Sequence, residues 1–139
     1  MKGYGAILAF VGAMILTHFL KFVTYWAKGK FKKPREALRL ALRSGGMPSG
    51  HSADMVALST YLGLWRGFDS AIFALAVGVS IIVMFDAMNV RYAVGEMGKV
   101  LNDVSGKKMR VYAGHTLPQV IAGALLGVVV GGAVWLVLG

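Results

Sequence analysis

The chain has 139 residues, of which 57% are hydrophobic, with a formal net charge of +9, no cysteine and a mean hydropathy of +0.66. This length predicts one domain over residues 1–139, and the hydropathy exceeds that of soluble domains, so an integral membrane protein is expected. Without cysteine, disulfides and thiolate metal sites are excluded, and the basic residues lie in two polar connections instead of the aromatic-interleaved stripe typical of nucleic-acid binding.

Four apolar segments predict membrane helices, at about residues 4–26, 52–65, 70–88 and 117–138. Crossing a bilayer takes roughly 20 helical residues, so the first and last are long enough. The second, with 14 residues, covers only about 21 Å. It either begins below the interface or forms a helical hairpin with the third through the turn "RGFDS". The sequence therefore predicts an all-α polytopic transmembrane bundle of about four membrane helices, with a short or re-entrant second helix.

The positively charged residues predict the orientation of this bundle. Most of them lie in two connections: Lys28, Lys30, Lys32, Lys33, Arg35, Arg39 and Arg43 in the first, and Arg91, Lys99, Lys107, Lys108 and Arg110 in the second. The opposite side carries only Lys2 and Arg66. By the positive-inside rule, both connections face the cytoplasm and both termini face outward.

This topology places two histidines and two cations at one membrane face. His51, in "PSGH", precedes the second segment, and His115, in "GHTLPQ", precedes the fourth. Lys21 lies about one and a half helical turns before the end of the first segment, and Arg91 follows the third. We therefore expect these four side chains to form one recessed site at the cytoplasmic face.

Such a site is suited to a phosphate ester. A helix N-terminus binds phosphate through its free amides, and glycine at position 50 allows close backbone approach. Lys21 and Arg91 can stabilise the charge of a transferring phosphoryl group. One histidine can attack phosphorus while the other protonates the leaving alcohol, since both titrate near neutral pH. This chemistry requires no metal and no cofactor.

Several of these residues also have purely structural interpretations. "PSGH" can be an ordinary turn before a helix, and "GHT" can be a Thr116 cap. We interpret His18 as a packed or polar residue of the bundle and Asp54, in the first turn of its helix, as a capping carboxylate. Asp86, inside a segment, is expected to face the bundle and to pair with a cation or a histidine.

Glycines repeat every four residues on the last segment. Gly123, Gly127 and Gly131 form a doubled GxxxG ridge, which predicts close helix packing. Short helices with such a ridge also suggest a homodimer.

Three stretches together resemble a known superfamily: "GGMPSGHSA" (residues 45–53), "MFDAMNVRYAVGEMGKVLN" (residues 84–102) and "GHTLPQVIAGALLG" (residues 114–127). In this order they are similar to the divergent branch of the type 2 phosphatidic acid phosphatases, whose superfamily also contains vanadium haloperoxidases. The resemblance extends from "THFLK" to the glycine-rich last segment, and thus over nearly the whole chain.

The resemblance implies roles for individual residues. His51 would be the general acid, His115 the nucleophile and Lys21 the lysine of the first motif. Ser49 and Gly50 belong to the "PSGH" motif and would contribute to substrate binding. The superfamily pattern continues K-x6-R-P, whereas this chain has Lys28 and Gly29 at the R-P positions.

The third motif differs as well. Arg110 precedes the second histidine by four intervening residues instead of five, and Arg91, in "DAxxVR", is favoured for the phosphate clamp. Gln119 replaces the aspartate that supports the nucleophile; its amide can accept a hydrogen bond from the imidazole but cannot stabilise an imidazolium as a carboxylate would. Asp86 is the obvious replacement carboxylate.

Two functions remain open. The first is an integral membrane phosphatase that hydrolyses a lipid or prenyl phosphate by a metal-free phosphohistidine mechanism. The second is a catalytically silent membrane protein that binds phosphate or lipid headgroups. A zinc site of His18, His51 and His115 and a haloperoxidase activity are minor alternatives. The expected partners are a lipid phosphate substrate and the bilayer, and nothing in the sequence identifies the lipid.

Overall fold

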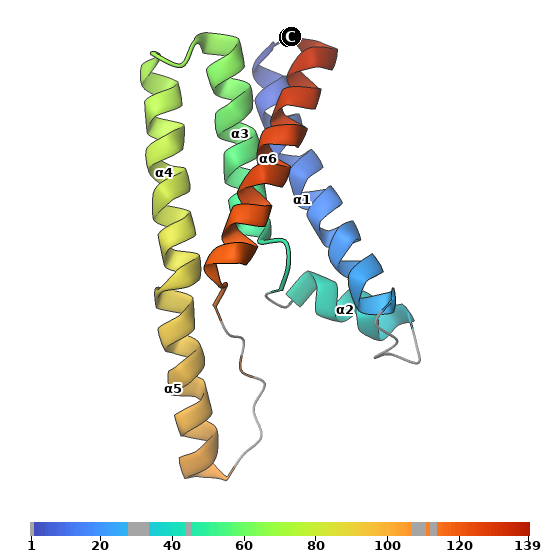
Figure 1. The fold of residues 1–139 in the computed structure, drawn as a ribbon, viewed down its shortest axis with the longest axis vertical. Helices are drawn as coiled ribbons and strands as arrows, with labels where there is room; N and C mark the ends of the chain where they lie inside the picture. Colours follow the sequence, from blue (N-terminus) through green and yellow to red (C-terminus); the bar gives the residue numbers. More distant parts are fainter. Residues whose placement is uncertain (1, 28–33, 44–45, 107–110, 112–113) are drawn as a thin grey trace.

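The computed structural model describes residues 2–27, 34–43, 46–106, 111 and 114–139. Within these residues the structure has helices and no strands (Figure 1). In chain order they are α1 (Lys2–Ala27), α2 (Pro34–Arg43), α3 (Gly50–Arg66), α4 (Ala71–Met88), α5 (Val90–Ser105) and α6 (Leu117–Leu138). The predicted all-α polytopic bundle is confirmed.

Three stretches of helix are long and apolar enough to cross a membrane. They are Gly3–Ala27, Ala71–Ser105, which joins α4 and α5, and Leu117–Leu138. The 17 residues of α3 rise only about 26 Å, less than the roughly 30 Å of a hydrocarbon core. The predicted short second helix is therefore found.

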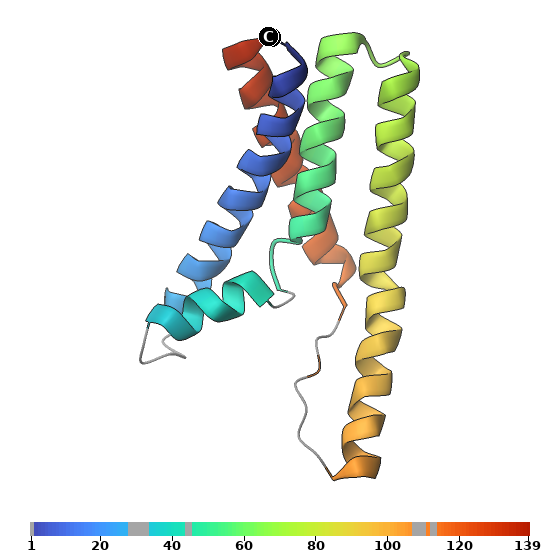
Figure 2. The ribbon, with the colours of Figure 1, turned by 180° about the vertical axis from the view of Figure 1, so that it is seen from behind.

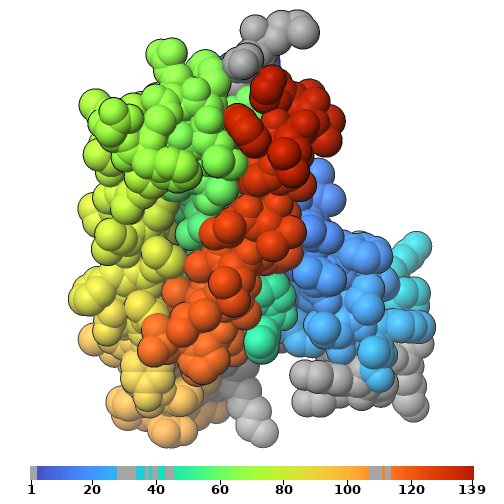
Figure 3. Space-filling view, turned by 45° about the horizontal axis from the view of Figure 1, so that its top comes forward, coloured from blue at the N-terminus to red at the C-terminus, as the bar shows by residue number. Residues whose placement is uncertain are grey.

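The bundle is organised around α3, which packs against α1, α4 and α6. In the space-filling view of Figure 3, α6 lies across the front of the molecule with α4 on one side and α1 on the other. Ala53, Ala57 and Tyr61 of α3 are fully buried. Since small residues dominate this core, the helix backbones approach each other closely.

The glycine ridge of α6 produces the closest approach. A Cβ atom on Gly127 or Gly131 would lie under 3.0 Å from a backbone carbonyl oxygen of α3, and one on Gly123 equally close to the carbonyl oxygen of Ser49, the residue that caps α3. The predicted close packing is thus confirmed, because only glycine leaves room for the α3 backbone at these positions. The ridge is used within the chain, against α3.

The turn between α3 and α4 is a tight hairpin, one of the two alternatives predicted for the short second segment. Gly67 has φ of 95°, which favours glycine, and its N–H donates to the carbonyl of Gly63 at 2.9 Å. Ser70 caps α4 by accepting a hydrogen bond from the N–H of Phe73 at 3.3 Å. Deeper in the bundle, the Ser59 and Ser80 hydroxyls are 2.8 Å apart, a polar link between the two helices.

The two helices α2 and α5 were not predicted, since both fall in the basic connections. Figures 1 and 2 show α2 lying across the lower end of α1, and α5 continuing almost in line with α4 beyond Asn89. The same views place the N-terminal end of α1 and the C-terminus together at the opposite end of the bundle. The starts of α3 and α6 lie side by side at the ends of these helices that are away from the C-terminus, as the proposed site requires.

Candidate functional site

The start of α3 is held by a serine cap and by α6. The Ser49 hydroxyl accepts hydrogen bonds from the Ser52 N–H at 3.5 Å and the Ser52 hydroxyl at 2.8 Å. The N–H of Ser49 donates to the backbone carbonyl of Gln119 at 3.0 Å. Because Ser49 is fully buried, we assign its side chain to positioning the helix and not to contact with a substrate. This framework places His51 in the first turn of α3.

His115 is held between α4 and α6. Its backbone N–H donates to the carbonyl of Ala87, in the last turn of α4, at 2.8 Å. Its Nδ1 lies 3.1 Å from Oε1 of Gln119, which also accepts the N–H of Thr116 at 3.1 Å. Since that oxygen accepts from a backbone N–H, the imidazole must donate from Nδ1. The lone pair of neutral His115 is therefore on Nε2.

Arg91 connects α5 to the start of α3. Its Nη2 lies 3.4 Å from Nε2 of His51, and its Nε donates to Oδ2 of Asp86 at 3.0 Å. A guanidinium has only donors, so Nε2 of His51 is the acceptor here. The predicted pairing of Asp86 with a cation is found, and it also shows that Asp86 does not support His115; Gln119 occupies that position.

Lys21 lies on the other side of the same helix start. Its side chain is only 4% exposed. A Cβ atom on Gly50 would lie 3.9 Å from Nζ of Lys21 and 3.7 Å from Cγ2 of Thr17. Glycine at position 50 thus brings the α3 backbone next to the ammonium group, and the first turn of α3 is flanked by Lys21 and Arg91.

The two imidazoles share an electrostatic environment that favours their neutral forms. Burial lowers the pKa of His51, and the charges of Arg91, His115 and Lys21 lower it further, with Asp86 opposing them. Burial also lowers the pKa of His115, while the hydrogen bond with Gln119 raises it and Lys21 and Arg91 lower it. The neutral imidazole of one histidine can act as a nucleophile. A negatively charged ligand in the site would favour protonation of the second histidine.

Other predicted residues are placed differently. Arg110, the second candidate for the arginine, lies outside the described residues. His18 forms a hydrogen bond through Nδ1 with the carbonyl of Met14 in its own helix, at 2.6 Å. No three His, Cys, Asp or Glu side chains of the described residues are grouped as a metal site needs. His18, His51 and His115 therefore do not form the zinc site considered from the sequence.

Asp54 does not have the predicted capping role, because Ser49 caps α3. Its Oδ1 is buried and has no hydrogen-bond partner among the described residues, and the same is true of the Thr17 hydroxyl. Asp54 interacts electrostatically with Lys21 and His18 of α1. The sequence signal was available: Asp54 is four residues after Gly50, so both lie on the face of α3 directed at α1.

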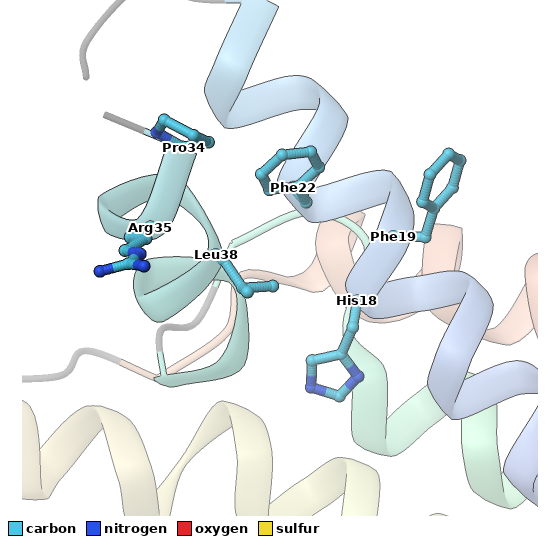
Figure 4. Close-up of a pocket in the computed structure, with 6 residues that line it drawn as sticks. All are labelled: His18, Phe19, Phe22, Pro34, Arg35 and Leu38. Atoms are coloured by element: carbon cyan, nitrogen blue, oxygen red, sulfur yellow. The ribbon is translucent and has the colours of Figure 1, made fainter. Parts of the chain in front are cut away.

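An apolar groove adjoins the site between α1 and α2. It has a volume of about 470 Å³ and is lined by His18, Phe19, Phe22, Pro34, Arg35 and Leu38. Figure 4 shows His18 and Phe22 extending from α1 and Leu38 from α2, while the guanidinium of Arg35 points away from them. Lys21 follows His18 by one helical turn, so the groove begins close to the cationic end of the site.

Comparison with known proteins identifies the family. The sequence profile of the divergent PAP2 family, in which PAP2 denotes type 2 phosphatidic acid phosphatase, matches residues 4–130. The chain belongs to the divergent PAP2 family. YuiD, an uncharacterized membrane protein of Bacillus subtilis (strain 168), is 34% identical over 110 residues, which cover 64% of this chain and 70% of YuiD. No solved structure shows significant similarity to the chain.

Membership of the divergent PAP2 family agrees with the membrane character of the fold. The apolar helices α1, α4 and α6 and the membrane-protein relative establish that the chain is an integral membrane protein. As a divergent PAP2 protein, it retains both histidines of the PAP2 pattern but has Gln119 at the aspartate position. The side-chain oxygen of Gln119 accepts a hydrogen bond from His115, a contact that a carboxylate at this position could also make.

Proposed function

We propose that this divergent PAP2 protein is an integral membrane phosphatase that hydrolyses a lipid or prenyl phosphate monoester or diphosphate. One observation carries the proposal: the Gln119 hydrogen bond holds the proton of His115 on Nδ1 and leaves the Nε2 lone pair available for attack on phosphorus. A second histidine and two cations lie at the same helix start. These are the groups that phosphoryl transfer through a covalent phosphohistidine uses.

Substrate binding would rely on the start of α3. The first backbone N–H groups of the helix and its dipole attract phosphate oxygens, and Gly50 leaves space for them. Lys21 and Arg91 supply positive charge from opposite sides, so the negative charge of the transition state is compensated by groups that are already in place. The proposed phosphate position is therefore at the N-terminus of α3, between His51 and His115.

The reaction would proceed in two displacements. The negative charge of the bound phosphate ester favours protonation of His51, so the first displacement begins with His51 as an imidazolium. Nε2 of neutral His115 attacks phosphorus, the bond from phosphorus to the ester oxygen breaks, and protonated His51 gives its proton to the departing alkoxide. In the second, His51 takes a proton from water, the water oxygen attacks phosphorus, and the bond between phosphorus and Nε2 breaks. Inorganic phosphate leaves, and both histidines return to their initial states.

The groove between α1 and α2 supports a lipid as the substrate. An acyl or prenyl chain would lie along Phe19, Phe22 and Leu38, while its phosphate reaches Lys21. A water-soluble phosphate ester makes no use of this surface. By the positive-inside rule, this end of the molecule faces the cytoplasm.

Gln119 favours a second candidate, a silent protein that binds phosphate or lipid headgroups. A neutral amide cannot stabilise the imidazolium form of His115 as a carboxylate would. In this alternative, the cations and the α3 N-terminus bind phosphate and no bond to it breaks.

Trapping of the intermediate separates the two functions. Purified protein is mixed briefly with a lipid phosphate labelled with ³²P and quenched in alkali, where phosphohistidine survives. Wild type and the control His18→Ala, which removes the histidine of the groove and leaves His51 and His115 in place, should both retain acid-labile label, whereas His115→Ala should not. Activity retained in His115→Ala without an adduct in wild type would refute the mechanism. Binding without turnover in all three proteins, with activity gained in Gln119→Asp, would establish the silent alternative.

A further inference from the structure

The helix α5 has an apolar edge with a regular spacing. Its members are Val90, Val94, Met97, Leu101 and Val104, separated alternately by four and three residues. This alternation is the 3.5-residue repeat of helices that pack lengthwise against another helix. We call these five residues the α5 seam.

No helix among the described residues covers the seam. Its side chains are 52, 60, 69, 53 and 81% exposed in chain order. Apart from α4, which it follows, α5 packs against none of the other described helices. A different face of α5 is covered by the returning chain, since Val111 would lie 3.0 Å from a Cβ atom on Gly98. Other positions of α5 are exposed as well, but the seam is the part of the exposed surface where apolar residues recur along the whole helix.

The seam lies beyond the hydrocarbon core. The 18 residues of α4 rise about 27 Å, which nearly spans a bilayer core. The helix α5 then begins next to Arg91 and carries the ion pair of Lys99 and Glu96, whose side chains are 59 and 47% exposed. Charged groups of this kind belong in water or among headgroups. Five large apolar side chains thus expose on the order of 500 Å² to an aqueous environment, more than the roughly 400 Å² that a soluble surface tolerates.

We infer that the α5 seam is the contact surface for a second copy of this chain, in a parallel homodimer. The bilayer gives both copies the same orientation, so a two-fold axis along the membrane normal brings two identical seams together side by side. The two faces would bury roughly 1,000 Å² in total, the lower limit for a specific interface. Of the residues that flank the seam, Ala93, Gly98, Val100 and Ser105 carry no charge, and the charged one, Arg91, is paired with Asp86 of its own chain.

Disulfide crosslinking tests this interface, because the natural chain contains no cysteine. In membranes treated with copper phenanthroline, Val94→Cys and Leu101→Cys should form a species of twice the chain mass. The matched control is Lys99→Cys, on the opposite face of α5, and it should crosslink at least tenfold less. Equal crosslinking at all three positions, or none at the two seam positions, would overturn the inference.

A second measurement keeps the inference testable if oxidation is inefficient. Leu101→Glu should convert the dimer into a monomer in single-molecule photobleaching of labelled protein in vesicles, with helix content unchanged by circular dichroism. Asp103→Lys, a charge change on the polar face, should leave the dimer intact. If a probe at Val94 is instead quenched by nitroxides on lipid chains, the seam lies on the bilayer and the dimer is wrong. Neither experiment depends on turnover, so both are independent of the proposed phosphatase activity.

Discussion

At the scale of single residues, Gln119 fixes the tautomer of His115 and thereby which nitrogen can act as a nucleophile. Its side-chain oxygen accepts from the backbone N–H of Thr116 and is thereby fixed as an acceptor toward the imidazole. An amide and a carboxylate would both hold the same tautomer. They differ in charge, because only a carboxylate stabilises the imidazolium form.

Opposite pH shifts should therefore follow from two substitutions of Gln119. Gln119→Leu removes a hydrogen bond that raises the pKa of His115. The acidic limb of the kcat/KM profile should move to lower pH, and the rate should fall by about tenfold or more as the tautomer is no longer fixed. Gln119→Glu adds a negative charge, so the pKa of His115 and the acidic limb should both rise. If the acidic limb moved in the same direction in both variants, the contact between His115 and Gln119 would be contradicted.

The loss of activity on removing His51 should be larger for substrates with poorer leaving groups. As the proposed acid, its removal in His51→Ala should lower turnover of an alkyl phosphate by roughly 10² to 10⁴-fold. An aryl phosphate leaves as a stable phenolate and should lose much less. Steady-state rates on the two substrates make the comparison, and equal losses on both would rule out proton donation by His51.

At the scale of elements, two helices meet backbone to backbone. The α6 glycines at positions 123, 127 and 131 allow α3 to approach so closely that its carbonyl oxygens touch the ridge. This packing also fixes the geometry of the site, because the Ser49 N–H at the start of α3 donates to the Gln119 carbonyl in the first turn of α6. Widening the contact would therefore move His51 relative to His115.

A single methyl group added to the glycine ridge should lower the stability of the fold. In Gly127→Ala, the added Cβ would lie 2.6 Å from the carbonyl oxygen of Ala53 and 2.9 Å from the N of Ala57, and the rigid backbone has to shift. A loss of roughly 1–3 kcal/mol in unfolding free energy is expected, as for other overpacked cores. Gly132→Ala is the matched control on the same helix, since its Cβ would meet nothing within 4 Å. Unfolding in mixed SDS and mild-detergent micelles measures both, and equal stabilities would refute the close contact.

Sequence patterns predicted these elements unequally. Long apolar runs define α1, α4 and α6, and the last begins and ends where expected, at Leu117 and Leu138. The helices α2 and α5 were missed because their charges were interpreted only as topological signals, although the spacing of Val94, Met97 and Leu101 is helical. In the site, the predicted topology brought His51 and His115 together. The partner of Asp86 and the burial of the Asp54 carboxylate oxygen depend on helix rotation, which hydropathy does not fix.

At the scale of the whole molecule, the site is formed by segments that enter one end of the bundle. The starts of α3 and α6 and the end of α4 meet there, while the N-terminal end of α1 and the C-terminus lie at the other end (Figures 1 and 2). The position of this end relative to the cytoplasm follows from the basic connections alone.

Cysteine labelling tests that orientation. Glu36→Cys and Asp103→Cys, both at exposed positions in α2 and α5, should react with a membrane-impermeant maleimide only after the cells are opened. Asp69→Cys, in the exposed turn between α3 and α4, is the matched control and should react in intact cells. The reverse pattern would place the site on the outer face.

The main-chain bonds at the site have a consequence for how the family can change. The Ser49 N–H bonds to the Gln119 carbonyl and the His115 N–H to the Ala87 carbonyl, so three helices are joined by groups that every amino acid except proline supplies. Mutation can then exchange the reactive side chains while the scaffold around them is inherited intact. A substitution at Gln119 or at His115 that is not proline leaves these main-chain bonds in place. In the laboratory, the same independence makes the alanine variants of the two histidines suitable as traps that hold an unreacted ligand in the native fold.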